Sequence, residues 1–110
     1  MSETLFVKKI LIYLEQRRDL ICWRNNVGAS QMNNRWVRFG VPGHADIFGI
    51  LEGGKFFCVE AKFGKGRQSK EQKDFEHKVS SIGGEYILAY SLADIHARLP
   101  EYPHKLRMDF

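Results

Sequence analysis

Two acids and a lysine lie beside apolar runs near the middle of this 110-residue chain. Asp46 opens the stretch DIFGIL, and Glu60 and Lys62 lie at the end of the stretch KFFCVEAK. Carboxylate oxygens are the ligands that Mg²⁺ and Mn²⁺ prefer in proteins. A lysine beside such an ion can orient or deprotonate an attacking water, or stabilise the charge that develops on a phosphate. The three residues therefore fit a site for metal-dependent hydrolysis.

The same residues also fit a hairpin with one solvated face. Side chains alternate between the two faces of a strand, so Cys58, Glu60 and Lys62 share one face of the strand expected at 55–63. Glu60 and Lys62 would then form an ion pair, which is compatible with a catalytic lysine. The strongly apolar neighbours favour a central hairpin instead, and an acid on a central strand needs a partner such as a divalent cation.

The length of the hairpin loop decides whether the two acids meet. A two-residue Gly-Gly turn pairs Asp46 with Ala61 and puts the carboxylates on opposite faces of the sheet. A three-residue loop at 52–54 pairs Asp46 with Glu60, with Gly54 at the left-handed position that this loop type requires. A β-bulge near Asp46 would also bring the acids together. Directly opposed Cβ atoms lie about 4.5–5.5 Å apart, so the two charges repel unless a cation lies between them.

The rest of the sequence predicts the elements that must position these residues. Apolar residues at helical spacing predict a helix at 2–17, and Ser69 with Gln72 three residues later predicts a second helix that ends at a glycine pair. A loop is expected at 26–34 and a final helix at 91–99. Strands are expected at 20–25, 35–39, 45–51, 55–63 and 85–90. This order predicts an α/β fold in which a mixed central sheet is flanked by helices.

Composition is typical of one globular domain that spans residues 1–110. A hydrophobic fraction of 44% argues against disorder, and the net charge of +4 is compatible with an acidic partner such as nucleic acid. Cys22 and Cys58 lack a metal-type spacing, which is typical of a reduced intracellular protein. The chain shows no signal peptide and no apolar run of membrane-spanning length, which predicts a cytosolic protein with no membrane partner. Trp23 and Trp36 are expected in the core.

The stretch GVPGHADIFGI, the EAK at the end of the hairpin and the SKEQ before the second helix resemble the VRR-NUC branch of the PD-(D/E)XK nuclease superfamily. The family pattern is a Gly-rich turn and an Asp, a hairpin, E-x-K, a basic loop, and Ser-x-x-Gln at the start of a helix. A helix with an early Glu precedes these motifs, so the resemblance covers residues 3 to about 90. One departure is that three residues separate Pro42 from Asp46, whereas many members place a proline directly before the Asp.

The resemblance implies a restriction-endonuclease-like αβββαβ core and a set of site residues. Its metal ligands would be Asp46, Glu60 and the backbone carbonyl of Ala61, and the cofactor would be Mg²⁺, with Mn²⁺ as a substitute. The catalytic residues that it implies are Glu3, Asp46, Glu60, Lys62 and Gln72.

Three parts of this assignment have a plain structural alternative. Glu3 is otherwise a first-turn acid that suits the helix dipole. Gln72 is otherwise only the partner of Ser69 in a capping box. The residues expected to contact DNA phosphates would otherwise form an ordinary solvated basic segment; they are Lys65, Arg67, Lys70 and Lys73.

The function that the resemblance implies is Mg²⁺-dependent hydrolysis of phosphodiester bonds in DNA by a small endonuclease of phage type. The expected substrate is branched DNA such as a four-way (Holliday) junction, and the expected form is a homodimer, because a two-fold axis relates two cuts. A flap, nicking or restriction-type nuclease with the same core is one alternative. A DNA-binding module without turnover is the other, and the intact Asp46, Glu60 and Lys62 argue against it.

Overall fold

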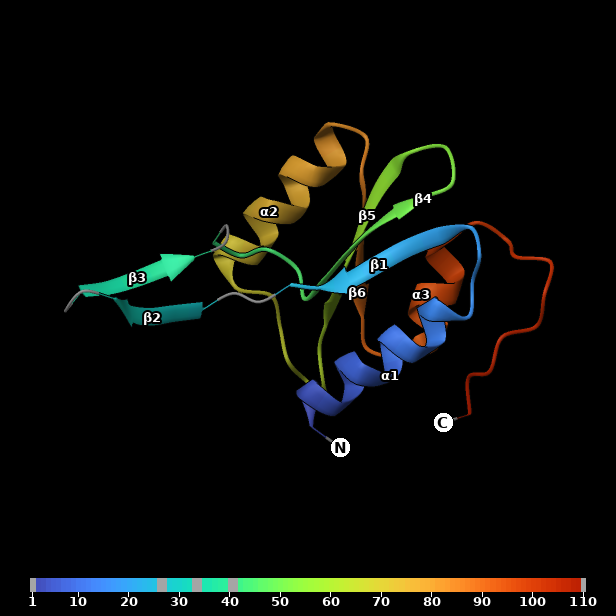
Figure 1. The fold of residues 1–110 in the computed structure, drawn as a ribbon, viewed down its shortest axis with the longest axis horizontal. Helices are drawn as coiled ribbons and strands as arrows, with labels where there is room; N and C mark the ends of the chain where they lie inside the picture. Colours follow the sequence, from blue (N-terminus) through green and yellow to red (C-terminus); the bar gives the residue numbers. More distant parts are fainter. Residues whose placement is uncertain (1, 26–27, 33–34, 40–41, 110) are drawn as a thin grey trace.

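The computed structural model describes residues 2–25, 28–32, 35–39 and 42–109, and it contains a mixed sheet flanked by helices (Figure 1). Strand β4 is antiparallel to both β1 and β5, and β6 lies parallel to β5, which gives the four-stranded order β1-β4-β5-β6. Strands β2 and β3 form a separate antiparallel pair. The elements in chain order are α1 (Glu3–Glu15), β1 (Leu20–Arg24), β2 (Gly28–Met32), β3 (Arg35–Phe39), β4 (Ile47–Leu51), β5 (Lys55–Ala61), α2 (Lys70–Ser81), β6 (Glu85–Ala89) and α3 (Leu92–Arg98).

Helix α1 begins at a capped terminus that places an acid at one end of the sheet. The Oγ of Ser2 accepts the backbone N–H of Leu5 at 3.1 Å, and Glu3 lies in the first turn, where the helix dipole favours a negative charge. The buried residues of the helix recur at helical spacing and are Phe6, Val7, Ile10, Tyr13 and Leu14. Because this apolar stripe anchors α1 to the sheet, the position of Glu3 relative to the strands is defined.

Each face of the main sheet has its own apolar core. One face packs against α1 and α3 and buries Ile47, Phe57 and Val59. The other face packs against α2, where Cys58 and Tyr86 are buried. The strand β5 is therefore covered on both faces, which confirms the prediction that the hairpin of Glu60 is central to the fold.

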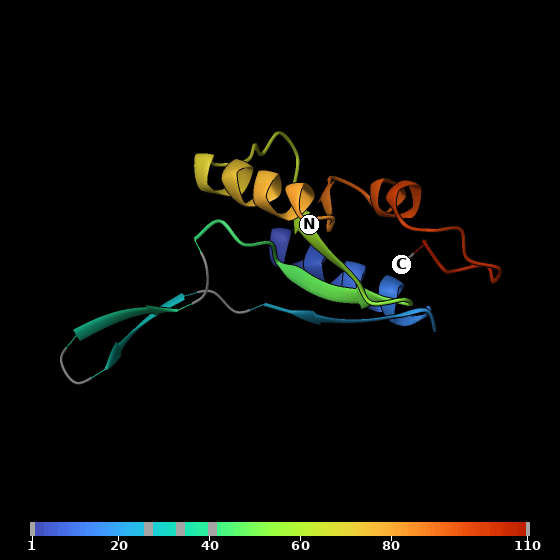
Figure 2. The same ribbon diagram turned by 90° about the horizontal axis from the view of Figure 1, so that it is seen from above.

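Residues 28–32 of the segment 26–34 are not part of the loop that its Asn, Gly and Ser content predicts. Gly28–Met32 forms β2, which pairs with β3 in the register Ser30 to Val37, and Figure 2 shows this hairpin extending away from the main sheet. Small polar residues are poor strand formers alone, so pairing with the aromatic and β-branched strand RWVRF overrides the local preference. Residues 26–27 and 33–34 lie outside the described residues.

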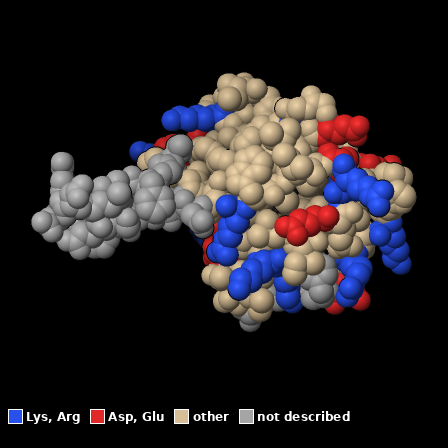
Figure 3. All heavy atoms as spheres, in the orientation of Figure 1, with Lys and Arg blue, Asp and Glu red and all other residues tan. Residues whose placement is uncertain are grey.

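The prediction that Trp23 packs in the core is wrong. Trp23 is 44% exposed and Ile21 is 63% exposed, and both lie on β1. Strand β1 is the edge of the main sheet, and its face opposite α1 stays open to solvent; Figure 3 shows an uncharged area over it. The matching prediction for Trp36 concerns a side chain outside those that the structure describes.

Arg17 and Asp19 hold the turn between α1 and β1. Arg17, with a side chain 1% exposed, donates from two nitrogens to the two carboxylate oxygens of Asp19 at 2.9 and 2.7 Å. It also donates to the carbonyl of Pro100 at 2.8 Å, and its guanidinium lies 5.0 Å from the ring centre of Tyr102. This ion pair therefore ties the C-terminal segment to the start of the sheet.

We expect Asp19→Asn to lower the free energy of unfolding by about 2 kcal/mol at neutral pH, because it leaves a buried guanidinium without its counter-charge. The hydrogen bonds from Arg17 lower the pKa of Asp19. An acid with a lowered folded pKa stabilises the fold above its unfolded pKa, and this contribution is lost as the pH falls through the folded pKa. Urea unfolding of wild type and variant should therefore converge at acidic pH. A difference that stays constant with pH would contradict this role.

Candidate metal centre

The β4–β5 hairpin has the register that brings Asp46 and Glu60 together. Ile47 pairs with Val59, and a three-residue loop closes the hairpin, so the next pair toward the sheet end is Asp46 and Glu60. Gly54 has a φ of 89°, as this loop type requires. Of the two loop lengths that the sequence allows, the structure has the one that places both acids on the same face.

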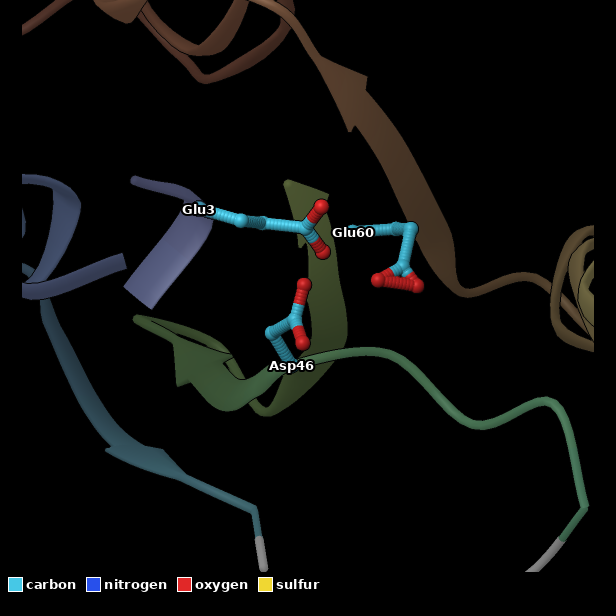
Figure 4. Close-up of side chains that lie close together, drawn as sticks. All are labelled: Glu3, Asp46 and Glu60. Atoms are coloured by element: carbon cyan, nitrogen blue, oxygen red, sulfur yellow. The ribbon is translucent and has the colours of Figure 1, made fainter. Parts of the chain in front are cut away.

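Three carboxylates converge at this end of the main sheet (Figure 4). Glu3 comes from the start of α1, Asp46 from the residue before β4, and Glu60 from β5. One carboxylate oxygen of each residue lies within 4.8 Å of those of the other two. Glu60 is buried, Asp46 is half-buried and Glu3 is exposed, so the cluster opens to solvent on the α1 side.

Asp46 is held through both its side chain and its backbone. Its Oδ2 accepts the backbone N–H of Ala61 at 2.8 Å, in place of a ladder hydrogen bond, which explains why β4 begins later and β5 ends earlier than the sequence predicts. Its carbonyl accepts the N–H of Asn25 at 2.8 Å, and the Asn25 side chain donates to the carbonyl of Ala45 at 3.1 Å. Nothing in the sequence pattern singles out Asn25, because its place depends on the pairing of β1 with β4.

Ala61 turns its backbone toward Asp46. A strand residue directs its N–H and its C=O to the same side, so the carbonyl of Ala61 faces the side on which Asp46 lies. The following residue, Lys62, donates its N–H to the carbonyl of Ala89 at 2.9 Å. The end of β5 is therefore held between β6 and the segment that carries Asp46.

Glu60 is the acid whose ionisation the site opposes most. Burial and the neighbouring Asp46 carboxylate raise the pKa of Glu60 to about 9; Lys62 acts in the opposite direction, and Glu3 adds to the rise. Without metal the site therefore favours the protonated form of this carboxyl, whereas a divalent cation among the three acids favours its ionised form. A cluster of oxygen donors with excess negative charge fits Mg²⁺ or Mn²⁺.

Gln72 contacts the site and caps α2 at the same time. Its Nε2 donates to Oε2 of Glu60 at 3.0 Å, while its Oε1 accepts the backbone N–H of Ser69 at 2.9 Å. The Oγ of Ser69 in turn accepts the N–H of Gln72 at 3.1 Å. The capping contact and the contact with Glu60 are made together, because the cap holds the amide in the orientation that points its nitrogen at Glu60.

We expect Gln72→Ala to weaken the binding of Mn²⁺ about tenfold, as loss of a group that orients a metal ligand does. Ser69→Ala is the matched control, because it also removes a cap worth about 1 kcal/mol but keeps the contact to Glu60. Calorimetric titration with Mn²⁺ measures the affinity, and thermal melting measures the loss of the cap. Equal metal affinities in the two variants would show that Gln72 acts only as a capping residue.

Lys62 directly follows β5, and its side chain is half-buried. Its stem packs near Gly66, where an added Cβ would lie 3.5 Å from the Lys62 Cδ. Among the described residues no ion pair joins Lys62 to Glu60, although its charge acts on the pKa of that acid. The four residues expected to contact DNA follow the site along the chain and are all exposed; they are Lys65, Arg67, Lys70 and Lys73.

The turn before Asp46 packs against the first turn of α2. Gly43 has a φ of 75°, and a Cβ at this position would lie 2.2 Å from the carbonyl oxygen of Glu71. Only glycine allows this approach, because other residues are strained at such a φ. The three residues between Pro42 and Asp46 therefore lead the chain along α2 and into the site.

Sequence comparison of the chain with protein-family models gives no match, and neither does comparison with curated proteins. In the part of the chain that the structure describes, no helix has the length and apolar character needed to cross a membrane. Function is therefore inferred from the residues that the fold brings together.

Proposed function

We propose that this chain is a metal-dependent DNA endonuclease with a PD-(D/E)XK core of the VRR-NUC type. The observation that supports it most is the convergence of Glu3, Asp46 and Glu60, with Lys62 two residues beyond Glu60. The element order supports it too: with the β2–β3 hairpin set aside, α1, β1, β4, β5, α2 and β6 follow the αβββαβ pattern.

Asp46, Glu60 and the carbonyl of Ala61 are the proposed ligands of Mg²⁺ or Mn²⁺, and Glu3 adds an oxygen donor from α1. When bound, the ion supplies Lewis acidity toward a phosphate oxygen and toward water. Gln72 orients the carboxylate of Glu60 through its hydrogen bond of 3.0 Å. A cation held by these carboxylates would place a scissile phosphate and a water at this end of the sheet.

Lys62 acts on the water or on the phosphate. Its ammonium group orients the attacking water or stabilises the negative charge that develops on the phosphate oxygens, whereas deprotonation of the water would need its neutral amine. The exposed basic residues on the loop after Lys62 and at the start of α2 contact phosphates on either side of the cut. Their contribution falls with rising salt, because they release counterions from the DNA.

Branched DNA is the proposed substrate, four-way junctions above all, and a homodimer is the proposed form. Two-fold symmetry places two sites in the arrangement that paired cuts across a junction require.

Cutting of a four-way junction, a flap and a linear duplex, each in Mg²⁺ and in EDTA, tests the proposal. We expect Mg²⁺-dependent cutting that is fastest on the junction. We also expect Lys62→Ala to abolish cutting and to leave DNA binding largely intact. Fastest cutting of the flap or the duplex would favour a flap, nicking or restriction-type enzyme. DNA binding without any cutting by the wild type would favour a non-catalytic module.

A further inference from the structure

An apolar pocket of about 450 Å³ opens between the starts of α1 and α3 and the ends of β5 and β6. Its walls include Phe6 and Lys9 from α1, Phe63 after β5, Tyr90 after β6, and Met108. Phe63 and Tyr90 are 48% and 45% exposed, so two aromatic rings face solvent there. No role in the candidate metal centre accounts for these rings.

The same elements, α1 and the end of β5, carry residues of the pocket and of the candidate metal centre. Phe6 follows Glu3 by about one helical turn, a spacing that puts the Cβ atoms of two residues roughly 5–6 Å apart. Phe63 directly follows Lys62, and Tyr90 directly follows β6, the strand whose last carbonyl accepts the Lys62 N–H at 2.9 Å. The start of α1, which carries both Glu3 and Phe6, therefore joins the pocket to the candidate metal centre.

The charges around the pocket favour an anionic molecule. Lys9 lies in the wall, and Lys62, Lys65 and Arg67 lie on the segment that leads away from the site. In the described part of the chain none of these four cations forms an ion pair. The hydroxyl of Tyr90 donates to the carbonyl of Gly66 at 2.8 Å, which ties this basic segment to the pocket wall. Aromatic side chains and Lys9 in the wall, with a basic segment tied to it through Tyr90, match the base and the phosphate of a nucleotide.

We propose that this pocket binds an unpaired nucleobase of the DNA strand whose phosphate lies at the three carboxylates. The inference rests on the proposed nuclease function and narrows its substrate class to DNA with an unpaired nucleotide beside the cut. Stacking on an aromatic side chain raises affinity by about tenfold or more per base and tolerates any sequence. A base within intact duplex must first be unstacked and unpaired, so branched or single-stranded regions supply the ligand at lower cost.

The test measures binding in Ca²⁺, an oxygen-ligated cation of looser geometry than Mg²⁺, and the DNA is checked to remain uncut. The probe is a duplex with a short single-stranded arm, made once with thymine bases and once with abasic sugars throughout the arm. We expect the wild type to bind the base-bearing arm about tenfold more tightly by fluorescence anisotropy. Phe63→Ala should bind both arms equally, and Phe63→Tyr, which keeps the ring, should retain the preference. Ile12→Ala, at an α1 position 54% exposed, is the control outside the pocket.

Thermal melting of each variant shows that loss of preference is not loss of fold. Equal affinity of the wild type for both arms, or a preference unchanged in Phe63→Ala, would overturn the pocket proposal. So would a dimer, seen by sedimentation, that Phe63→Ala dissociates while both arms bind equally, because the pocket would then be a contact between two copies. Cutting of the junction and flap in Mg²⁺ is scored separately. Cutting without a base preference contradicts only the pocket, and a base preference without cutting contradicts only the nuclease function.

Discussion

Asp46→Asn should lower Mg²⁺-dependent cutting by about a hundredfold or more, since the stabilisation that a catalytic metal supplies is worth several kcal/mol. The substitution changes charge with little change of shape. An amide oxygen still accepts the N–H of Ala61, which Asp46 Oδ2 accepts at 2.8 Å. The hairpin therefore keeps its register. The loss of cutting then measures the contribution of the negative charge that Asp46 adds to those of Glu3 and Glu60.

Cutting of a four-way junction over a range of Mg²⁺ concentrations separates metal affinity from rate in this variant. Asp74→Asn, at an exposed position on α2, removes the same charge away from the three carboxylates and should cut as the wild type does. We expect Asp46→Asn to be about as stable as the wild type without metal, because its amide oxygen can still accept the N–H of Ala61. Wild-type cutting by Asp46→Asn would remove this residue from the site.

Gly43→Ala should lower the free energy of unfolding by about 3 kcal/mol and disturb the site in the molecules that remain folded. A side chain at its left-handed φ of 75° is strained, and the new Cβ would lie 2.2 Å from the carbonyl oxygen of Glu71 and 2.7 Å from the nitrogen of Gln72. The turn must then move away from α2. Asp46 lies three residues further on and moves with it, away from the acid that Gln72 orients.

Gly83→Ala is the matched control for this prediction. Gly83 has a φ of 93°, but a Cβ there meets nothing within 4 Å. Gly83→Ala should therefore lower the free energy of unfolding only by the backbone strain, about 1–2 kcal/mol, and leave the affinity for Mn²⁺ unchanged. Urea unfolding and metal titration of both variants give the comparison. Equal losses of stability together with equal metal affinities would show that packing of the turn on α2 does not position Asp46.

Local rules predicted much of the candidate site, because its residues lie on elements with strong local patterns. The alternation of side chains along β5 indicates which residues share a face with Glu60, and a left-handed glycine at position 54 is typical of the three-residue loop. The rules for helix caps likewise locate the starts of α1 and α2 within a residue. These rules left two loop lengths open, and the packing of β5 against its neighbours selects one of them.

These local rules do not predict contacts between segments that lie far apart in the sequence. The capping rule places Gln72 along its own helix, but its bond to Glu60 depends on how α2 docks on the sheet. Asn25 reaches Asp46 only because β1 pairs with β4. Phe63 and Tyr90 line one pocket only because β5 and β6 end together. Strand β2 forms against its local propensity because β3 is its partner. Each of these features is set by tertiary packing and has no signature within a short stretch of sequence.

Anomalous diffraction from crystals soaked in Mn²⁺ tests the central claim most directly. We expect a peak between the carboxylates of Asp46 and Glu60, within bonding distance of both, and no such peak in crystals of Asp46→Asn. A saturated soak with no ion at these carboxylates, or with Asp46 turned away from Glu60 and the ion bound elsewhere, would contradict the assignment of this cluster as a metal centre.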